Sequence, residues 1–156
     1  MTRVEIQQKF VTRFGVTPPT PSPPIAETDL DRAEFQLGIV FPRAYRQFVL
    51  TYGPVWTPNI LQITVDHQCE TWDISWFFTP SECVEDTRLY RSGSMSERLV
   101  AFASDCMGNS FCFDQSDLFD ARPDDAAVWF FDHDYCQDSK LSDTFDQWLT
   151  TYVHLP

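Results

Sequence analysis

The sequence has few of the features that mark membrane, secreted or metal-binding proteins. No stretch approaches the ~20 consecutive apolar residues that cross a bilayer. Charged and polar residues interrupt residues 1–16, which therefore lack the apolar region of a signal peptide. The five cysteines form no C-x-x-C pair of the kind that zinc sites usually contain. We therefore expect a cytoplasmic protein with free thiols and without a bound metal or cofactor.

Catalytic motifs are also absent from the sequence. It contains no G-x-S-x-G, no Walker loop, no H-E-x-x-H and no G-x-G-x-x-G. A metal-dependent hydrolase could use Asp114, Asp132 and His133, but these residues have no recognised ligand spacing. We therefore favour a protein that is not an enzyme and has no catalytic residue.

Positive charge is scarce. The chain has 11 Lys and Arg against 23 Asp and Glu, a net charge of −12. Residues 105–146 contribute −9 of this charge, because eleven Asp and no Glu stand against Arg122 and Lys140. Aromatic residues are interleaved with these acids, so we expect a folded acidic surface rather than a disordered tail. Such a surface favours a basic protein partner and repels nucleic acid and anionic membranes.

Length and composition fit a single domain, residues 1–156. A hydrophobic content of 43% and an aromatic content of 15% are ample for one core. Apolar residues at helical spacing predict an N-terminal helix within residues 1–16. Five prolines in residues 17–24 predict an extended connector. Residues 25–156 are expected to form the core of the domain.

Start and stop signals predict further helices. Thr28, with Asp31 three residues later, is a partial capping box for a second helix, which Gly38 ends. Pro42 begins a third helix, and Gly53 stops it. Two more helices are expected over residues 79–90 and along the apolar stripe of residues 141–152.

Runs of β-branched and aromatic residues predict strands. Residues 105–109 predict a hairpin turn in which Gly108 and Asn109 adopt positive φ angles. Helices, then strands, then one closing helix predict an α+β fold, with an antiparallel β-sheet flanked by N-terminal helices and a C-terminal helix. The strands are expected over residues 60–65, 72–78, 99–103, 110–114 and 127–131.

The segment from Glu34 to Phe48 carries the pattern E-x-x-L-G-hydrophobic-x-x-P-x-x-Y-x-x-F. This pattern resembles the opening of SMI1/KNR4-like domains of the SUKH superfamily. The similarity is collinear over residues 24–153, although Tyr52-Gly53 stands where the family usually has Asn-Gly. Three later segments are similar to the family's hairpin, last strand and last helix: residues 103–114, 128–134 and 145–149.

The resemblance implies an α+β domain without enzymatic activity. Many bacterial members of the family are immunity proteins that neutralise toxin domains, often nucleases. Combined with the acidic segment, the resemblance favours an immunity protein whose partner is a basic toxin. A regulatory adaptor, like the eukaryotic members, is the alternative. The pattern covers scaffold positions and transfers no binding residue to this chain.

We expect partner contacts from acids and nearby aromatic residues. Carboxylates that meet Lys or Arg raise association rates, and aromatic residues anchor interfaces. Each acid could instead serve solubility alone. The chain is expected to be a monomer or a weak homo-oligomer. The candidate partner-binding residues are Asp117, Asp120, Asp124, Asp125 and Asp134, with Trp56 and Tyr135 as apolar anchors.

Overall fold

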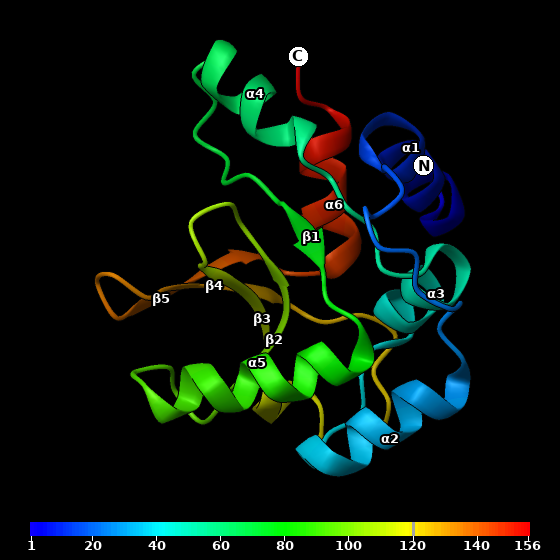
Figure 1. Cartoon of the computed structure of the whole chain (residues 1–156), viewed down its shortest axis with the longest axis vertical. Coiled ribbons are helices and arrows are strands. Elements are labelled where there is room, and N and C mark those ends of the chain that lie inside the picture. The colour runs from blue at the N-terminus through cyan, green and yellow to red at the C-terminus, as the bar shows by residue number, and fades with distance from the viewer. Residues whose placement is uncertain (120) are drawn as a thin grey trace.

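The computed structural model describes residues 1–119 and 121–156 (Figure 1). Within these residues it has six α-helices, a five-stranded sheet and one 3-10 turn, η1. No helix in the described residues is long and apolar enough to cross a membrane. The elements in chain order are α1 (Arg3–Phe14), α2 (Glu27–Leu37), α3 (Arg43–Tyr52), α4 (Asn59–Asp66), β1 (Trp76–Phe77), α5 (Pro80–Ser92), β2 (Leu99–Ser104), β3 (Ser110–Asp114), η1 (Gln115–Asp117), β4 (Val128–Asp132), β5 (Gln137–Ser142) and α6 (Phe145–Val153).

The strands form one antiparallel meander in the order β1-β2-β3-β4-β5, which confirms the predicted α+β fold. In β3 and β4, Ser110 pairs with Phe131 and Cys112 with Trp129. The β2–β3 turn precedes Ser110 and the β4–β5 turn follows β4, so both turns lie at the same end of the sheet. We call this the turn end, defined by residues 105–109 and 133–136.

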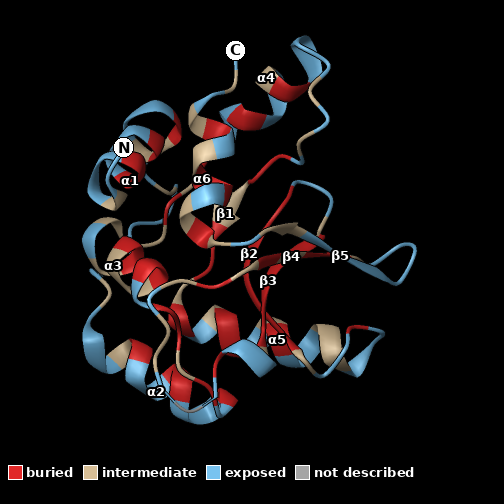
Figure 2. Ribbon diagram, turned by 180° about the vertical axis from the view of Figure 1, so that it is seen from behind, coloured by how far each residue is buried: buried red, intermediate tan, exposed pale blue. Residues whose placement is uncertain are grey.

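Helices cover both faces of the central strands. Side chains alternate along β3, and Phe111 and Phe113 face α6, where the Phe111 ring centroid lies 5.0 Å from that of Trp148. On the other face, α5 contributes Tyr90, which contacts Phe131 of β4. In Figure 1, α5 and α6 accordingly lie on opposite sides of β2 and β3. Every residue of these two strands is buried, whereas the β4–β5 turn is exposed (Figure 2).

The helix caps confirm most of the predicted helices. Thr2 forms a capping box at α1, and Thr79 forms one at α5. Gly38 ends α2 in the left-handed conformation, with a φ of 68°. Pro42 and Gly53 flank α3 as predicted.

The capping box of α2 lies two residues before the predicted one. The helix begins at Glu27, and the Asp29 carboxylate accepts a hydrogen bond from the backbone N–H of Ala26 at 2.9 Å. Asp31 does not take part in a capping box, because its carboxylate pairs with Arg46 at 3.1 Å. An ion pair with another helix thus replaces the predicted local contact.

The segment predicted as a strand over residues 60–65 is helix α4. Ile60 and Thr64 are buried four residues apart, whereas Leu61 and Val65 are exposed. This burial has the helical period of 3.6 residues rather than the strand period of two. The Thr64 hydroxyl donates to the Leu61 carbonyl at 2.8 Å, which satisfies it within the helix. One-sided burial therefore outweighs the β propensity of this run.

One predicted strand, one strand that was not predicted and one predicted turn residue also differ from expectation. The strand predicted over residues 72–78 is reduced to β1, and β5 was not predicted at all. Strand β5 is polar and exposed along most of its length, so it lacks the apolar alternation on which the prediction depended. Gly108 has the predicted positive φ, but Asn109 does not, and Cys136 adopts a φ of 51° in the β4–β5 turn.

Candidate functional site

The predicted partner-binding acids lie on separate parts of the molecule. Asp117 is exposed on η1, beyond the end of β3 opposite to the turn end. Asp134 is exposed in the β4–β5 turn. Asp124 and Asp125 lie beside Arg3 of α1. Asp120 lies outside the described residues. The structure therefore does not assemble these acids into one surface.

Asp124 and Asp125 connect the N-terminal helix α1 to α6 through ion pairs and hydrogen bonds. Arg3 donates to Asp124 at 2.7 Å and to Asp146 at 2.8 Å, and hydrogen bonding to Arg3 lowers the pKa of the Asp124 carboxyl. Asp125 accepts from the backbone N–H of Phe145, the first residue of α6, at 2.7 Å. Burial raises the pKa of Asp125 to about 6. Both carboxylates have contacts within the domain that account for their presence.

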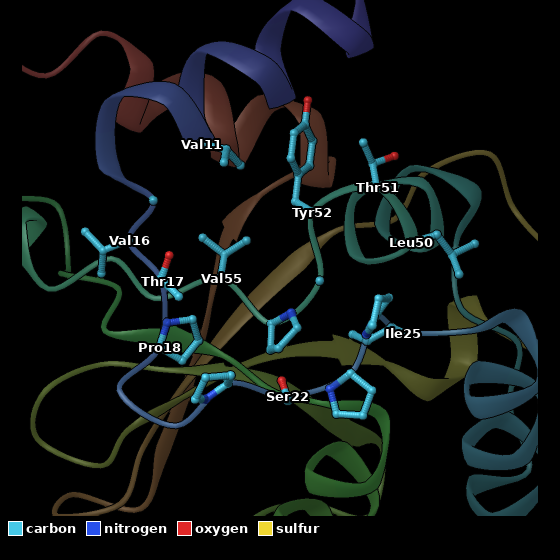
Figure 3. A pocket seen from close by; sticks show the side chains of 16 residues that line it. Val11, Val16, Thr17, Pro18, Ser22, Ile25, Leu50, Thr51, Tyr52 and Val55 are labelled. Carbon is cyan, nitrogen blue, oxygen red and sulfur yellow. The ribbon is translucent and has the colours of Figure 1, made fainter.

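Trp56 lies beside the proline-rich connector. Its backbone forms isolated bridges with Val16 and Trp76, and its ring stacks with Trp76 at a centroid distance of 6.0 Å. The adjoining groove has a volume of about 490 Å³ and no Asp, Glu, His, Lys or Arg in its lining (Figure 3). Labelled side chains around this groove include Val11, Pro18, Ile25, Leu50, Tyr52 and Val55.

At the turn end, a hydrogen-bonded network joins two turns. Asp105 accepts from the backbone N–H groups of Met107 and Asn109 and from the Asn109 side-chain amide at 2.9 Å. Asn109 Oδ1 accepts from the backbone N–H of His133 at 3.1 Å and faces the His133 ring Nδ1 at 2.7 Å. Burial raises the pKa of Asp105, against the lowering effect of its hydrogen bonds. The network holds the two turns in a fixed relation.

The loop between α4 and β1 joins the same end of the sheet. Asp73 accepts from the backbone N–H of Cys106 at 3.0 Å. The Trp72 ring stacks on Phe130 of β4, with centroids 4.4 Å apart and an interplanar angle of 13°. The Trp72 carbonyl accepts from the Tyr152 hydroxyl at 2.8 Å. Sequence reasoning placed Trp72 in a strand and therefore missed it as a surface residue.

Ion pairs divide the acids of residues 105–146 into two groups. Arg3, Arg98 and Lys140 pair with six of them, namely Asp114, Asp124, Asp125, Asp138, Asp143 and Asp146. In the part of the chain that the structure describes, the others have no Lys or Arg nitrogen within 4.0 Å. These are Asp105, Asp117, Asp132 and Asp134. Three of these four lie at the turn end of the sheet or on the last residue of β4.

The three residues of the hydrolase interpretation are not brought together. Asp114 ends β3 at the side away from the turn end and pairs with Arg98 at 2.6 Å. Asp132 is the last residue of β4 and His133 lies at the turn end, and Asp132 accepts from backbone N–H groups of the β4–β5 turn. In residues 1–119 and 121–156, no group of three His, Cys, Asp or Glu is placed to hold a metal ion.

Asp114→Asn is expected to make the protein less sensitive to acid. Partial burial opposes ionisation of Asp114, but hydrogen bonds from Ser116 and Arg98 lower its pKa overall. Its ionised form therefore stabilises the fold above about pH 4, the unfolded pKa, and this contribution is lost as the pH falls through the lower folded pKa. The variant should be about 1 kcal/mol less stable at neutral pH.

Urea unfolding at successive pH values measures this effect. The difference between wild type and Asp114→Asn should shrink as the pH falls below about 4. Asp117→Asn is the control, because Asp117 is exposed and has no Lys or Arg within 4.0 Å among the described residues. A difference for Asp114→Asn that stays constant with pH would contradict the prediction.

Comparison with known proteins gives one family match. A family model described as SMI1 / KNR4 family (SUKH-1) matches residues 24–151. The match includes every strand of the sheet and the turn end, whereas α1 precedes it. No curated protein matches the chain.

Proposed function

The chain belongs to the SMI1/KNR4 family (SUKH-1), and from this premise we propose that it is a non-enzymatic immunity protein that binds and neutralises a cognate toxin domain. Membership of this family supports an immunity or protein-interaction role. The match over residues 24–151 is the observation that carries the proposal, because it spans the whole sheet and its turns.

The charge of the chain supports a basic target, such as a nuclease. A nuclease holds phosphates with Lys and Arg, so an acidic protein can compete with nucleic acid for the same surface. With a net charge of −12, the protein would attract such a target over a long range. Electrostatic steering of this kind raises association rates to ~10⁸ M⁻¹s⁻¹ or above at low salt. Neutralisation would then require binding alone, in the cytoplasm, without a chemical step.

Co-expression with the toxin domain that we expect to be encoded beside the gene tests this proposal. We expect the protein to restore the growth of cells that produce the toxin domain, and to co-elute with it on gel filtration. The same toxin domain co-expressed with an unrelated acidic protein is the control for charge alone. Continued growth arrest, together with separate elution of the two proteins, would overturn the proposal.

A further inference from the structure

Three large apolar side chains are exposed together with the turns of the sheet. Trp72, Met107 and Tyr135 are 44%, 67% and 76% exposed. They come from the α4–β1 loop, the β2–β3 turn and the β4–β5 turn. Trp, Tyr and Met are enriched in protein interfaces, and Trp and Tyr in the residues that dominate binding energy. Single exposed apolar residues are ordinary, but a group from three adjoining loops indicates a binding surface.

The loops that carry these side chains are held in place. Asp73 binds the backbone of Cys106, and Asn109 joins Asp105 to His133. The Tyr90 hydroxyl of α5 also donates to the carbonyl of Gly108 at 2.7 Å. A partner would therefore meet a surface that is already ordered. Preorganisation of this kind lowers the entropic cost of binding.

The same loops carry negative charge without a neighbouring Lys or Arg. Residues 69–75, 105–109 and 132–136 contain no Lys or Arg. Their acids are Glu70, Asp73, Asp105, Asp132 and Asp134. In the described part of the chain, none of these acids has a Lys or Arg nitrogen within 4.0 Å. His133 Nε2 lies 3.3 Å from Asp134, so an incoming residue would be the first Lys or Arg, although not the first basic side chain, to pair with these acids.

The negative charge of these loops favours one kind of binding partner over the others. A second copy of the chain would bring the same acids into a two-fold contact, and like charges across an interface cost several kcal/mol. Nucleic acid and anionic membranes carry the same sign of charge and would be repelled. A basic protein surface with an apolar depression satisfies both the acids and the exposed side chains.

We propose that the turn-end surface, formed by Trp72, Met107 and Tyr135 among these acids, is the docking surface for a basic protein. Tyr135 and Met107 insert into an apolar depression of the partner, and Asp132 and Asp134 receive its Lys and Arg side chains. The identification of this partner as the toxin rests on the proposed function. The surface itself follows from the exposure, order and charge of the three loops.

Calorimetric titration with the toxin domain expected to be encoded beside the gene tests the surface. We expect the Met107→Ala/Tyr135→Ala variant to bind about 100-fold more weakly than wild type. Both side chains are exposed, so the variant should keep the fold. A variant with Phe35→Ala and Leu89→Ala is the matched control, because these side chains are 89% and 66% exposed on α2 and α5. Its affinity should stay within about threefold of wild type.

Alkylation of two native thiols can detect partner binding at this surface without any substitution. Cys106 and Cys136 are exposed within the turns, whereas Cys83 and Cys112 are buried. Alkylation of Cys106 and Cys136 should slow by about tenfold or more in the complex, because a covered thiol reacts only after the partner dissociates. Wild-type affinity of the Met107→Ala/Tyr135→Ala variant, or unprotected thiols in a formed complex, would overturn the proposed surface while leaving the immunity proposal intact.

A basic probe protein separates failure of the surface from failure of the proposed function. If the toxin domain does not bind wild type, the immunity proposal fails, and lysozyme at low salt then tests the surface by NMR titration. Amide shifts that cluster in residues 69–75, 105–109 and 132–136, and that weaken in a Glu70→Lys/Asp134→Lys variant, would support it, because both of these acids are exposed. Shifts centred on Asp117 or on other acids, or no shifts at all, would overturn it.

Discussion

Replacement of Glu34 by alanine is expected to lower the free energy of unfolding by about 3 to 5 kcal/mol, because it breaks a buried ion cluster. The Glu34 side chain is 7% exposed. It accepts from the backbone N–H of Phe41 at 2.6 Å, from Arg46 at 2.9 Å and from Arg122 at 3.1 Å. Its loss leaves Arg122 without a carboxylate partner among the described residues and leaves the Phe41 N–H unsatisfied.

Urea unfolding followed by Trp fluorescence measures this loss. Gln36→Ala is the control on the same helix, because Gln36 is exposed, and it should change stability by no more than about 0.5 kcal/mol. Glu34→Gln keeps one acceptor oxygen without the charge. Its loss of stability should lie between those of Glu34→Ala and Gln36→Ala. A loss below about 1 kcal/mol for Glu34→Ala would contradict the assignment of Glu34 as the shared acceptor.

The position of Glu34 explains why the family pattern predicts the fold but not the binding site. Glu34 opens the E-x-x-L-G pattern, and its carboxylate joins α2 to the start of α3 and to Arg122. Gly38 supplies the left-handed turn after α2, and Tyr45 and Phe48 are fully buried on α3. Each pattern residue thus has a role in packing or in chain reversal. None of these side chains is left for a partner.

Local signals were sufficient for five of the six described helices and for the central strands, but they failed for α4 and for the edge strand β5. The capping Thr residues and the apolar runs of β2 and β3 act over a few residues, so they can be read without the fold. Strand β5 is different, because only its pairing with β4 makes it a strand. Its sequence from Gln137 to Ser142 is that of a solvated edge, where charged residues prevent edge-to-edge association.

The proposed binding surface could be predicted only in part from the sequence, for a related reason. Asp124 and Asp134 look alike in sequence, since each has another Asp within two residues. They differ because Arg3, 121 residues away from Asp124 in the sequence, forms an ion pair with the Asp124 carboxylate. Tyr135 and Asp134 were identified from composition, whereas Trp72 and Met107 became candidates only when pairing brought their loops to one end of the sheet. Long-range contacts decide which charges and aromatic residues remain on the surface.

Replacement of Phe10 by alanine is expected to lower the free energy of unfolding by about 3 to 5 kcal/mol, although α1 precedes the matched family segment. Phe10 is fully buried. Its ring centroid lies 6.1 Å from that of Phe48, 5.9 Å from that of Phe77 and 6.1 Å from that of Tyr152. The ring therefore contacts α3, β1 and α6 at once, and its removal leaves a cavity between three elements.

Val4→Ala is the matched control for this prediction, because Val4 is 57% exposed on the same helix and should change stability by no more than about 0.5 kcal/mol. Chemical unfolding of both variants separates two views of α1. If α1 is an appendage, Phe10→Ala will resemble Val4→Ala. If α1 completes the core, Phe10→Ala will remove a large part of the free energy of unfolding, which is about 5 to 15 kcal/mol for a typical domain. The burial of Phe10 and the pairing of Arg3 with Asp124 and Asp146 favour the second result. The folding unit would then begin at α1 rather than at residue 24.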